Sequence, residues 1–243
     1  MKSLTALPSF DAEESPPARE PNRLGLTAIL SVVYLSLALA CLIQWNAPHP
    51  WARVDLISAW YLGTRLVGSI HSLISSRRAF QSRSLRREWW GQTSNPAIVK
   101  WVILLMLCDL LVFWDYGHWH LIPSLERPAL RCLGLVLYSV AVAWQIWTDS
   151  YLARHFSADD FPRVPTMIGP FRSVRHPRYA AAVLGKIALA LVFASPVGWL
   201  LLLPWTIVLV HKVRSEEVHL RKIFGAHYDA YAKKTARLLP GVY

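Results

Sequence analysis

The chain has 243 residues, of which 54% are hydrophobic and 17% are charged, and its formal net charge at pH 7 is +11. The mean hydropathy is positive, at +0.30. This balance predicts a membrane protein rather than a soluble domain. The basic residues gather in loops between apolar runs, which is typical of a polytopic membrane protein and argues against nucleic-acid binding.

Residues 1–23 are polar, rich in proline and partly acidic. We expect them to form a disordered tail without a cleavable signal peptide. Apolar runs fill much of the remaining chain, and the first four are long enough to cross the hydrocarbon core of a bilayer. The runs cover residues 24–44, 54–74, 98–116, 128–152, 179–194 and 197–210.

The last two apolar runs are short and are joined by Ser195-Pro196. A proline at the centre of a long apolar run breaks a helix, so we favour a tight hairpin over one broken helix. The predicted fold is therefore all-α: a polytopic transmembrane bundle of five to six spans that ends in a short helical hairpin and a cytoplasmic C-terminal helix. Residues 24–152 are expected to form a four-span region, and residues 153–243 a catalytic region.

The distribution of charge predicts the orientation. Loops 75–97 and 153–178 are rich in arginine, and the segment after residue 210 is rich in lysine and arginine. Loops 45–53 and 117–127 carry only one arginine each. The positive-inside rule then places both termini in the cytoplasm of a multi-pass protein, in a bacterial inner membrane or its equivalent. The arginine-rich segment Ser75–Gly91 is expected to be either a helix lying on the membrane surface or a solvated loop.

The segment from about His211 to Thr235 is predicted to be one helix. In that helix Glu217 falls on an apolar stripe with Leu220 and Phe224, and Glu216 lies on its edge. Carboxylates on an apolar face are costly unless they are paired. A functional role is favoured, because ionisable groups buried beside a membrane usually serve function. The alternative is a structural salt bridge to an arginine of the preceding polar loop.

A second polar block precedes the fifth apolar run. Gly169-Pro170 indicates a turn, and Pro177 suits the first position of a helix. His176 then lies at the mouth of that helix, next to several arginines. A helix start flanked by cations favours an anionic group such as a carboxylate.

The two blocks form a paired pattern over about residues 165–240. The first reads Gly-Pro-aromatic-Arg and then Arg-His-Pro-x-Tyr, and the second reads Glu-Glu-x-x-Leu-x-x-x-Phe-Gly-x-x-Tyr-x-x-Tyr and then Arg and Pro. The matching residues are Gly169, Pro170, Phe171, Arg172, Arg175, His176, Pro177, Tyr179, Glu216, Glu217, Leu220, Phe224, Gly225, Tyr228, Tyr231, Arg237 and Pro240. This pattern resembles the isoprenylcysteine carboxyl methyltransferase family of integral membrane methyltransferases and the related phospholipid methyltransferases.

The resemblance implies S-adenosylmethionine as the methyl donor, bound at the cytoplasmic face. It implies an acceptor that enters from the bilayer, such as a prenylcysteine carboxylate, a lipid or a small hydrophobic molecule. Glu216 and Glu217 resemble the carboxylates at the junction of cofactor and acceptor, and with Arg175 they are the expected catalytic residues. The residues expected to contact or cover the cofactor are Gly169, Pro170, Phe171, His176, Pro177, Tyr179, Tyr228, Tyr231, Arg237 and Leu239.

Methyl transfer from a sulfonium is an in-line displacement that needs no metal, and the three cysteines have no metal-site spacing. The catalyst chiefly aligns the reacting atoms and keeps out water. A buried carboxylate can pair with the ammonium group of the cofactor, lie near its sulfonium, or accept a proton from an amine or thiol acceptor. A carboxylate acceptor needs a cation instead, and Arg175, Arg178 or Arg237 can play that part.

Charges within the apolar runs are further candidates. Arg65 and Asp109 lie at similar depths in the second and third runs, so a structural pair is favoured, and the alternative is that one of them faces the acceptor. Arg178 and Lys186 make the inner mouth of the fifth run more basic than in relatives. Two other functions stay open: a sterol-type reductase that uses a nicotinamide cofactor, and a non-enzymatic membrane protein that keeps the fold.

Overall fold

The computed structural model describes residues 23–80, 96–155 and 167–239, and within these ranges the protein is all-α, as predicted. Short 3-10 or π turns occur at Asp115–Trp119 (η1), Pro123–Leu125 (η2) and Gly169–Phe171 (η3). The α-helices are α1 (Arg23–Leu42), α2 (Leu56–Phe80), α4 (Pro96–Cys108), α5 (Leu110–Trp114), α6 (Pro128–His155), α7 (Pro177–Val192), α8 (Pro196–Phe224) and α9 (Ala226–Lys234).

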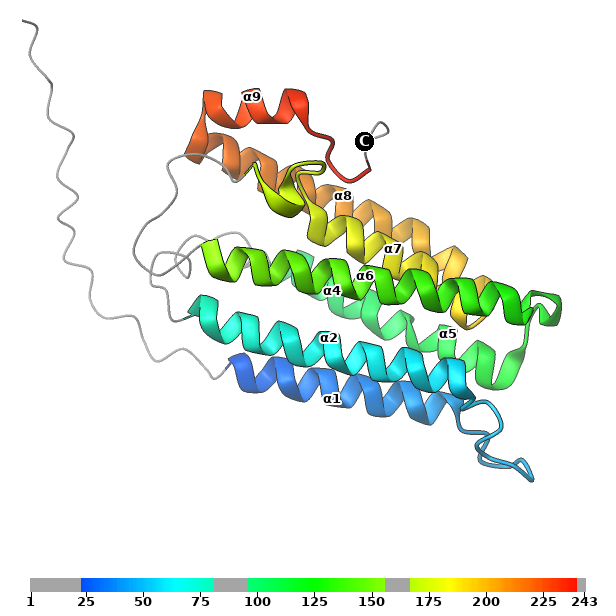
Figure 1. Cartoon of the computed structure of the whole chain (residues 1–243). Coiled ribbons are helices and arrows are strands. Elements are labelled where there is room, and N and C mark those ends of the chain that lie inside the picture. The colour runs from blue at the N-terminus through cyan, green and yellow to red at the C-terminus, as the bar shows by residue number, and fades with distance from the viewer. Residues whose placement is uncertain (1–22, 81–95, 156–166, 240–243) are drawn as a thin grey trace, which may run out of the picture.

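The long helices pack side by side into one bundle (Figure 1). Helix α6 packs against α2 on one side and α7 on the other, while α8 packs against α7 and α4, and α1 against α2. The last residues of α2, α6 and α8 lie at the same end of the bundle as the start of α7, and α9 folds across that end (Figure 1). The two polar sequence blocks therefore meet at one end of the bundle.

Aromatic side chains hold the middle of the bundle together. The Phe193 ring stands edge-on to Tyr61 and Phe113, with ring centroids 5.1 Å and 4.7 Å away, and Tyr61 also stacks obliquely on Tyr138 at 4.1 Å. All four rings are buried. Since they come from α2, α5, α6 and the turn after α7, these contacts join the first helices of the chain to the last ones.

Two of the described helices, α6 and α8, are long and apolar enough to cross a membrane. Their apolar side chains are largely on the outside: Leu200 and Leu203 of α8 are 75% and 69% exposed. A core helix of a soluble protein buries such residues, whereas a helix in lipid does not need to. The outer surface of α8 is therefore suited to contact with hydrocarbon.

The predicted hairpin is confirmed, because α7 and α8 are separate helices that pack together and join at Ala194-Ser195. Its second arm is longer than predicted, and the single helix expected from His211 to Thr235 is wrong. Helix α8 continues without a break through the polar block to Phe224. Gly225 then ends it with φ 52° and ψ −129°, a conformation that side-chain-bearing residues avoid, and α9 starts in a new direction.

Other expectations differ in detail or fall outside the described ranges. The third apolar run is divided at Asp109 and ends in the π turn η1. Residues 1–22, assigned to the tail, lie outside the described residues, whereas Arg23 already begins α1. The first part of the segment Ser75–Gly91 completes α2 up to Phe80, and the rest also lies outside the described residues.

Asp109 forms its ion pair with Lys186 of α7, not with Arg65 as favoured from the sequence. The Arg65 guanidinium lies over the Tyr34 ring instead, 5.4 Å from its centroid. The expected pair was based on depth in two consecutive spans. That prediction is wrong because the packing order of the helices brings α7, with the partly buried Lys186, next to the carboxylate.

A polar network closes the end of the bundle opposite the two polar blocks. Asp55, just before α2, accepts a hydrogen bond of 2.6 Å from Arg131 Nη1 and one of 2.9 Å from the backbone N–H of Ser58. Arg131 Nε donates to the Val192 carbonyl at 2.9 Å. The network therefore ties the start of α2 to α6 and to the end of α7.

Candidate functional site

The segment before α7 and the segment after α9 run side by side. The Arg175 N–H donates to the Ala236 carbonyl at 2.8 Å, the His176 N–H donates to the Arg237 carbonyl at 3.0 Å, and Val174 forms a parallel bridge with Ala236. These backbone contacts join residues about 60 positions apart in the chain. They align the side chains of the first polar block with those of the second.

Glu217 lies at the centre of this junction and is only 1% exposed. Arg237 Nε lies 3.1 Å and 3.0 Å from its two carboxylate oxygens. Arg175 Nε and His176 Nε2 lie 3.3 Å and 3.6 Å from Oε1. Partners on both sequence blocks thus neutralise a carboxylate whose burial alone would be costly.

Helix α9 covers the junction. The Tyr231 hydroxyl donates to the Phe171 carbonyl at 2.7 Å, and Arg175 Nη1 donates to the Ala232 carbonyl at 3.0 Å. Tyr228 is 1% exposed and its ring stands edge-on to Tyr231. Burial raises the pKa of both tyrosines above the usual range, so their hydroxyls keep the proton and remain donors at any physiological pH.

Glu216 has a different environment from its neighbour. It is partly exposed, accepts a hydrogen bond from the Tyr179 hydroxyl, and its Oε2 lies 3.7 Å from His176 Nδ1. His176 therefore stands between the two carboxylates, with one ring nitrogen toward each. The two carboxylates therefore differ: Glu217 is enclosed, and Glu216 is more accessible.

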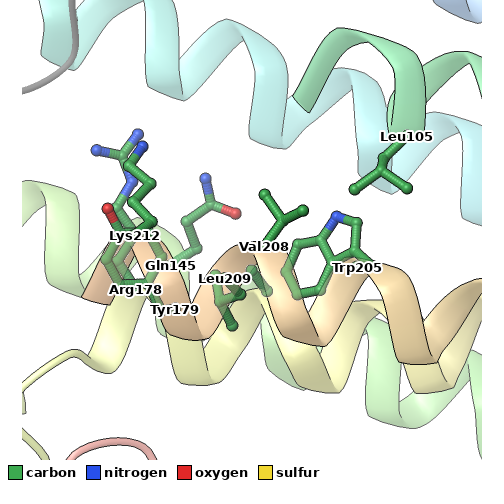
Figure 2. A pocket seen from close by; sticks show the side chains of 9 residues that line it. Leu105, Gln145, Arg178, Tyr179, Trp205, Val208, Leu209 and Lys212 are labelled. Carbon is green, nitrogen blue, oxygen red and sulfur yellow. The ribbon is translucent and has the colours of Figure 1, made fainter. Parts of the chain in front are cut away.

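Tyr179 also lines a half-open cavity of about 180 Å³ whose walls come from α4, α6, α7 and α8. Figure 2 shows that the cavity is polar at one end, where Gln145, Arg178 and Lys212 lie with Tyr179. The other end is lined by Leu105 and Trp205. Since the Tyr179 hydroxyl bonds to Glu216, the polar end of the cavity adjoins the junction of the two blocks.

Most of the predicted site residues come together at this place. Gly169 and Pro170 form the turn η3, where Gly169 has φ 61° and where an added Cβ would come within 2.5 Å of the Tyr151 ring. Pro177 begins α7, as predicted. Leu239 is exposed at the end of the described chain. The predicted residues that the junction brings into mutual contact are Phe171, Arg175, His176, Tyr179, Glu216, Glu217, Tyr231 and Arg237.

Sequence reasoning missed the residues that complete the cavity. Gln145 of α6 lines the polar end, and Asp149, one turn further along α6, lies 3.5 Å from Arg178 of the cavity wall. No motif includes them, because they lie in an apolar run far from both polar blocks. Lys212 could have been predicted from the sequence, because it lies four positions before Glu216 and therefore on the same side of α8.

The junction fits a ligand that carries both charged and aromatic groups. Tyr228 Oη is buried and has no hydrogen-bond partner among the described residues, and Arg175 Nε and His176 Nε2 lie near Glu217 without hydrogen-bonding geometry. Buried donors of this kind need acceptors. A carboxylate and sugar hydroxyls would satisfy them, and Glu216 could receive an ammonium group. These are the polar groups of S-adenosylmethionine.

Comparison with known proteins bears on the same region. Residues 129–227 match the family model described as phospholipid methyltransferase, a stretch that runs from α6 into α9 and includes His176, Tyr179, Glu216 and Glu217. No curated protein matches the chain. Residues 129–227 therefore belong to the phospholipid methyltransferase family, the family of isoprenylcysteine carboxyl methyltransferase-like membrane methyltransferases.

Proposed function

We propose that the protein is an S-adenosylmethionine-dependent methyltransferase that acts on a lipophilic acceptor held in the membrane. The observation that carries this proposal is the convergence of both polar blocks on Glu217, beside a cavity that continues between apolar helices. A water-soluble donor can reach the junction from the bundle end, and an apolar acceptor can reach it through the cavity. Membership of residues 129–227 in a methyltransferase family supports the same reaction class.

We assign cofactor binding to the junction under α9. When bound there, S-adenosylmethionine supplies an electrophilic methyl group on its sulfonium. Arg175 and His176 can hold a carboxylate, Glu216 can hold an ammonium, and the rings of Tyr228 and Tyr231 can cover an adenosine. The full proposed set is Gly169, Pro170, Phe171, His176, Pro177, Tyr179, Tyr228, Tyr231, Arg237 and Leu239.

The two carboxylates are proposed to have different roles. Both oxygens of Glu217 face cations of the chain itself, which supports a role in positioning Arg175, His176 and Arg237. Glu216 is more accessible and bonds to Tyr179, a residue of the cavity wall, so it is better placed to touch the reacting groups. Arg175 completes the proposed catalytic set, because it belongs to the first block and contacts Glu217 of the second. Catalysis then comes from aligning the reacting atoms and from keeping water out of the site.

We further propose five to six membrane spans with both termini in the cytoplasm. In support, α2 and α6 lead into their arginine-rich loops at the end of the bundle that carries the junction (Figure 1). The junction would then face the compartment in which a soluble methyl donor is available.

Binding of S-adenosylmethionine tests the proposal directly. Purified protein in nanodiscs should bind the cofactor with a micromolar-range dissociation constant by calorimetry, and a nicotinamide dinucleotide should not compete. Loss of the charge-assisted contacts of His176 in His176→Ala should weaken binding about 10- to 100-fold. His211→Ala, on the exposed side of α8, is the matched control and should bind normally. If S-adenosylmethionine does not bind detectably to the wild-type protein, the proposal is refuted.

Two outcomes separate the competing functions. Competition by the nicotinamide dinucleotide would favour a sterol-type reductase. Cofactor binding without any transfer, when membranes are incubated with methyl-labelled cofactor and lipid extracts, would favour a non-enzymatic protein that keeps the fold. A labelled lipid product would confirm the enzyme, and its identification would name the acceptor.

A further inference from the structure

The side chains that we assign to the cofactor are enclosed. Glu217 and Tyr228 are 1% exposed, and His176 and Tyr231 are 6% exposed. Two of these four side chains belong to α9, which covers the junction. A donor of the size of a nucleoside can therefore enter or leave only when a covering element moves, as in enzymes whose lids close over their substrates.

Helix α9 is the covering element that is best able to move. It lies between two residues that are not helical: Gly225, with φ 52°, and Thr235, which is extended with φ −129° and ψ 132°. The segments on either side are fixed. Helix α8 is continuous up to the glycine, and the segment after α9 is held by backbone hydrogen bonds from Arg175 and His176. Helix α9 can therefore tilt about its two ends while both neighbouring segments stay in place.

An exposed ion pair closes the outer side of α9. The Arg221 Nε donates to Asp229 Oδ1 at 3.0 Å, and the two side chains are 44% and 55% exposed. The pair joins the last turn of α8 to the first turn of α9, across the bend between them (Figure 1). On the inner side, α9 is held by the hydrogen bonds of Tyr231 and Arg175 described above. The outer pair is thus accessible to water and ions, whereas the inner contacts are not.

Arg221 also connects this outer pair with the site. Its guanidinium carbon lies 5.9 Å from the centroid of the Tyr228 ring, within the range of a cation–π contact. The hydroxyl of the same tyrosine is buried at the junction, where the charge of Glu217 acts on it. Arg221 therefore lies over the outer side of the ring that we assign to cover the adenosine. Any change that releases Arg221 from Asp229 also changes the support of Tyr228.

We propose that Arg221 is a positioning residue for cofactor exchange. With Asp229 it forms a latch that keeps α9 and the Tyr228 ring closed over S-adenosylmethionine, and opening of this latch sets the rates of cofactor entry and release. This inference rests on the proposed function and deepens it. Exposed ion pairs contribute little to stability, which lets the latch open often, and salt weakens them. Because α9 must open for entry and for release alike, the latch should change both rates and leave the dissociation constant nearly unchanged.

The kinetics of S-adenosylmethionine binding test this proposal. Surface plasmon resonance of the full chain in nanodiscs measures the association and dissociation rates separately. Arg221→Gln and Asp229→Asn should each raise both rates about two- to fivefold, as expected for the loss of an exposed ion pair, with little change in the dissociation constant. The dissociation rate of the wild type should rise with salt between about 0.05 and 0.5 M, and the two variants should lose most of this dependence.

Matched controls assign the effect to this pair. Lys222→Gln removes a neighbouring exposed charge from the same turn of α8 and should leave both rates unchanged. Glu126→Gln breaks the exposed-end pair with Arg53, 2.7 Å long, at the other end of the bundle and should also have no effect. The double reversal Arg221→Asp with Asp229→Arg should restore slow exchange, whereas each single reversal should accelerate it. Restoration by the reversed pair cannot come from local packing alone.

Three results would overturn the latch: unchanged rates in Arg221→Gln and Asp229→Asn, equal acceleration in Lys222→Gln, or no restoration in the double reversal. A rise confined to dissociation, with binding weakened in proportion, would also overturn it, since the pair would then be an ordinary binding contact. The two levels of inference fail separately. Binding with unchanged exchange rates refutes the latch alone. If the wild type does not bind the cofactor, the proposed function fails, and the latch survives only as a restraint on α9, which faster hydrogen exchange of the α9 amides in Arg221→Gln would show.

Discussion

Glu217 is the residue on which the candidate site depends most. Its carboxylate is enclosed by Arg175, His176 and Arg237, which come from the segments before α7 and after α9. Bringing a carboxylate and two guanidinium groups out of water is costly, and the arrangement persists only because each charge compensates the others. The same residue therefore keeps the junction folded and orients the groups proposed to hold the cofactor.

We expect Glu217→Gln to loosen the junction rather than only to slow the reaction. The amide removes the charge that compensates two largely buried arginines, and breaking such a pair costs about 3–5 kcal/mol. Hydrogen exchange of the Arg175 and His176 amides, which bond to the segment after α9, should report this as a loss of protection. Glu216→Gln, at the more accessible carboxylate, should change that protection little. Normal protection in Glu217→Gln together with lost turnover would instead make Glu217 a purely chemical participant.

At the scale of the element, α8 connects the membrane region with the site. It begins at Pro196 beside the end of α7, passes along the cavity at Trp205 and Lys212, and ends at Phe224 under α9. One continuous helix fixes the distance between the apolar end of the cavity and Glu216, because each residue adds about 1.5 Å along its axis. The direction of α9 is then set by the single turn at Gly225.

Substitution of Gly225 tests how much this turn matters. Its φ of 52° with ψ of −129° is strained for a side chain, although an added Cβ there would meet no atom within 4 Å. Gly225→Ala should therefore destabilise the docking of α9 by about 1–3 kcal/mol through the backbone alone, seen as faster hydrogen exchange in α9 and weaker cofactor binding. Gly63→Ala in α2, which also has open space around it but helical geometry, should be neutral or slightly stabilising. Unchanged exchange in Gly225→Ala would show that α9 docks without this turn.

The elements also show what a sequence can predict here. Apolar length predicts each long helix, and Ser195-Pro196 predicts the hairpin, because both signals are local. The break at Gly225 is not predicted, because an isolated glycine is tolerated inside a helical pattern as well as at a helix end. Pairing between distant helices is not local at all: the Asp109–Lys186 pair and the cavity wall depend on the order in which helices pack, which periodicity does not contain. The junction itself could be anticipated only because both of its sides carry dense polar patterns.

At the scale of the whole molecule, the two ends of the bundle have opposite characters. The junction end combines charged side chains, a cavity and two sequence blocks that are joined by hydrogen bonds. The other end is closed by Asp55, Arg131 and the Val192 carbonyl, and Arg131 also stacks over the Tyr116 ring at 4.7 Å. This closed end holds the start of α2, α6 and the end of α7 together, so we expect it to stabilise the walls of the cavity from a distance.

Acid should weaken this closed end. Burial by itself would raise the pKa of Asp55, but hydrogen bonds from Arg131 and Ser58 outweigh it and lower that pKa from 3.8 to about 2. Because the folded-state pKa is depressed, the stabilisation is complete above about pH 4 and is lost as the pH falls through about 2. The side chain is partly exposed, so we expect a contribution of only about 1–2 kcal/mol.

Asp55→Asn isolates that contribution. The variant should unfold at a lower temperature than the wild type at neutral pH, and this difference should shrink between pH 4 and pH 2, because the wild type then loses the same charge. Thermal unfolding of both proteins in nanodiscs at each pH measures it, with calorimetric binding of S-adenosylmethionine at neutral pH as the control. Binding should be nearly normal, since Asp55 lies at the end of the bundle opposite the junction. A difference in unfolding temperature that stays constant with pH would mean that the Asp55 side chain stabilises the fold by its packing rather than by its charge. A large loss of cofactor binding would mean that the two ends of the bundle are coupled.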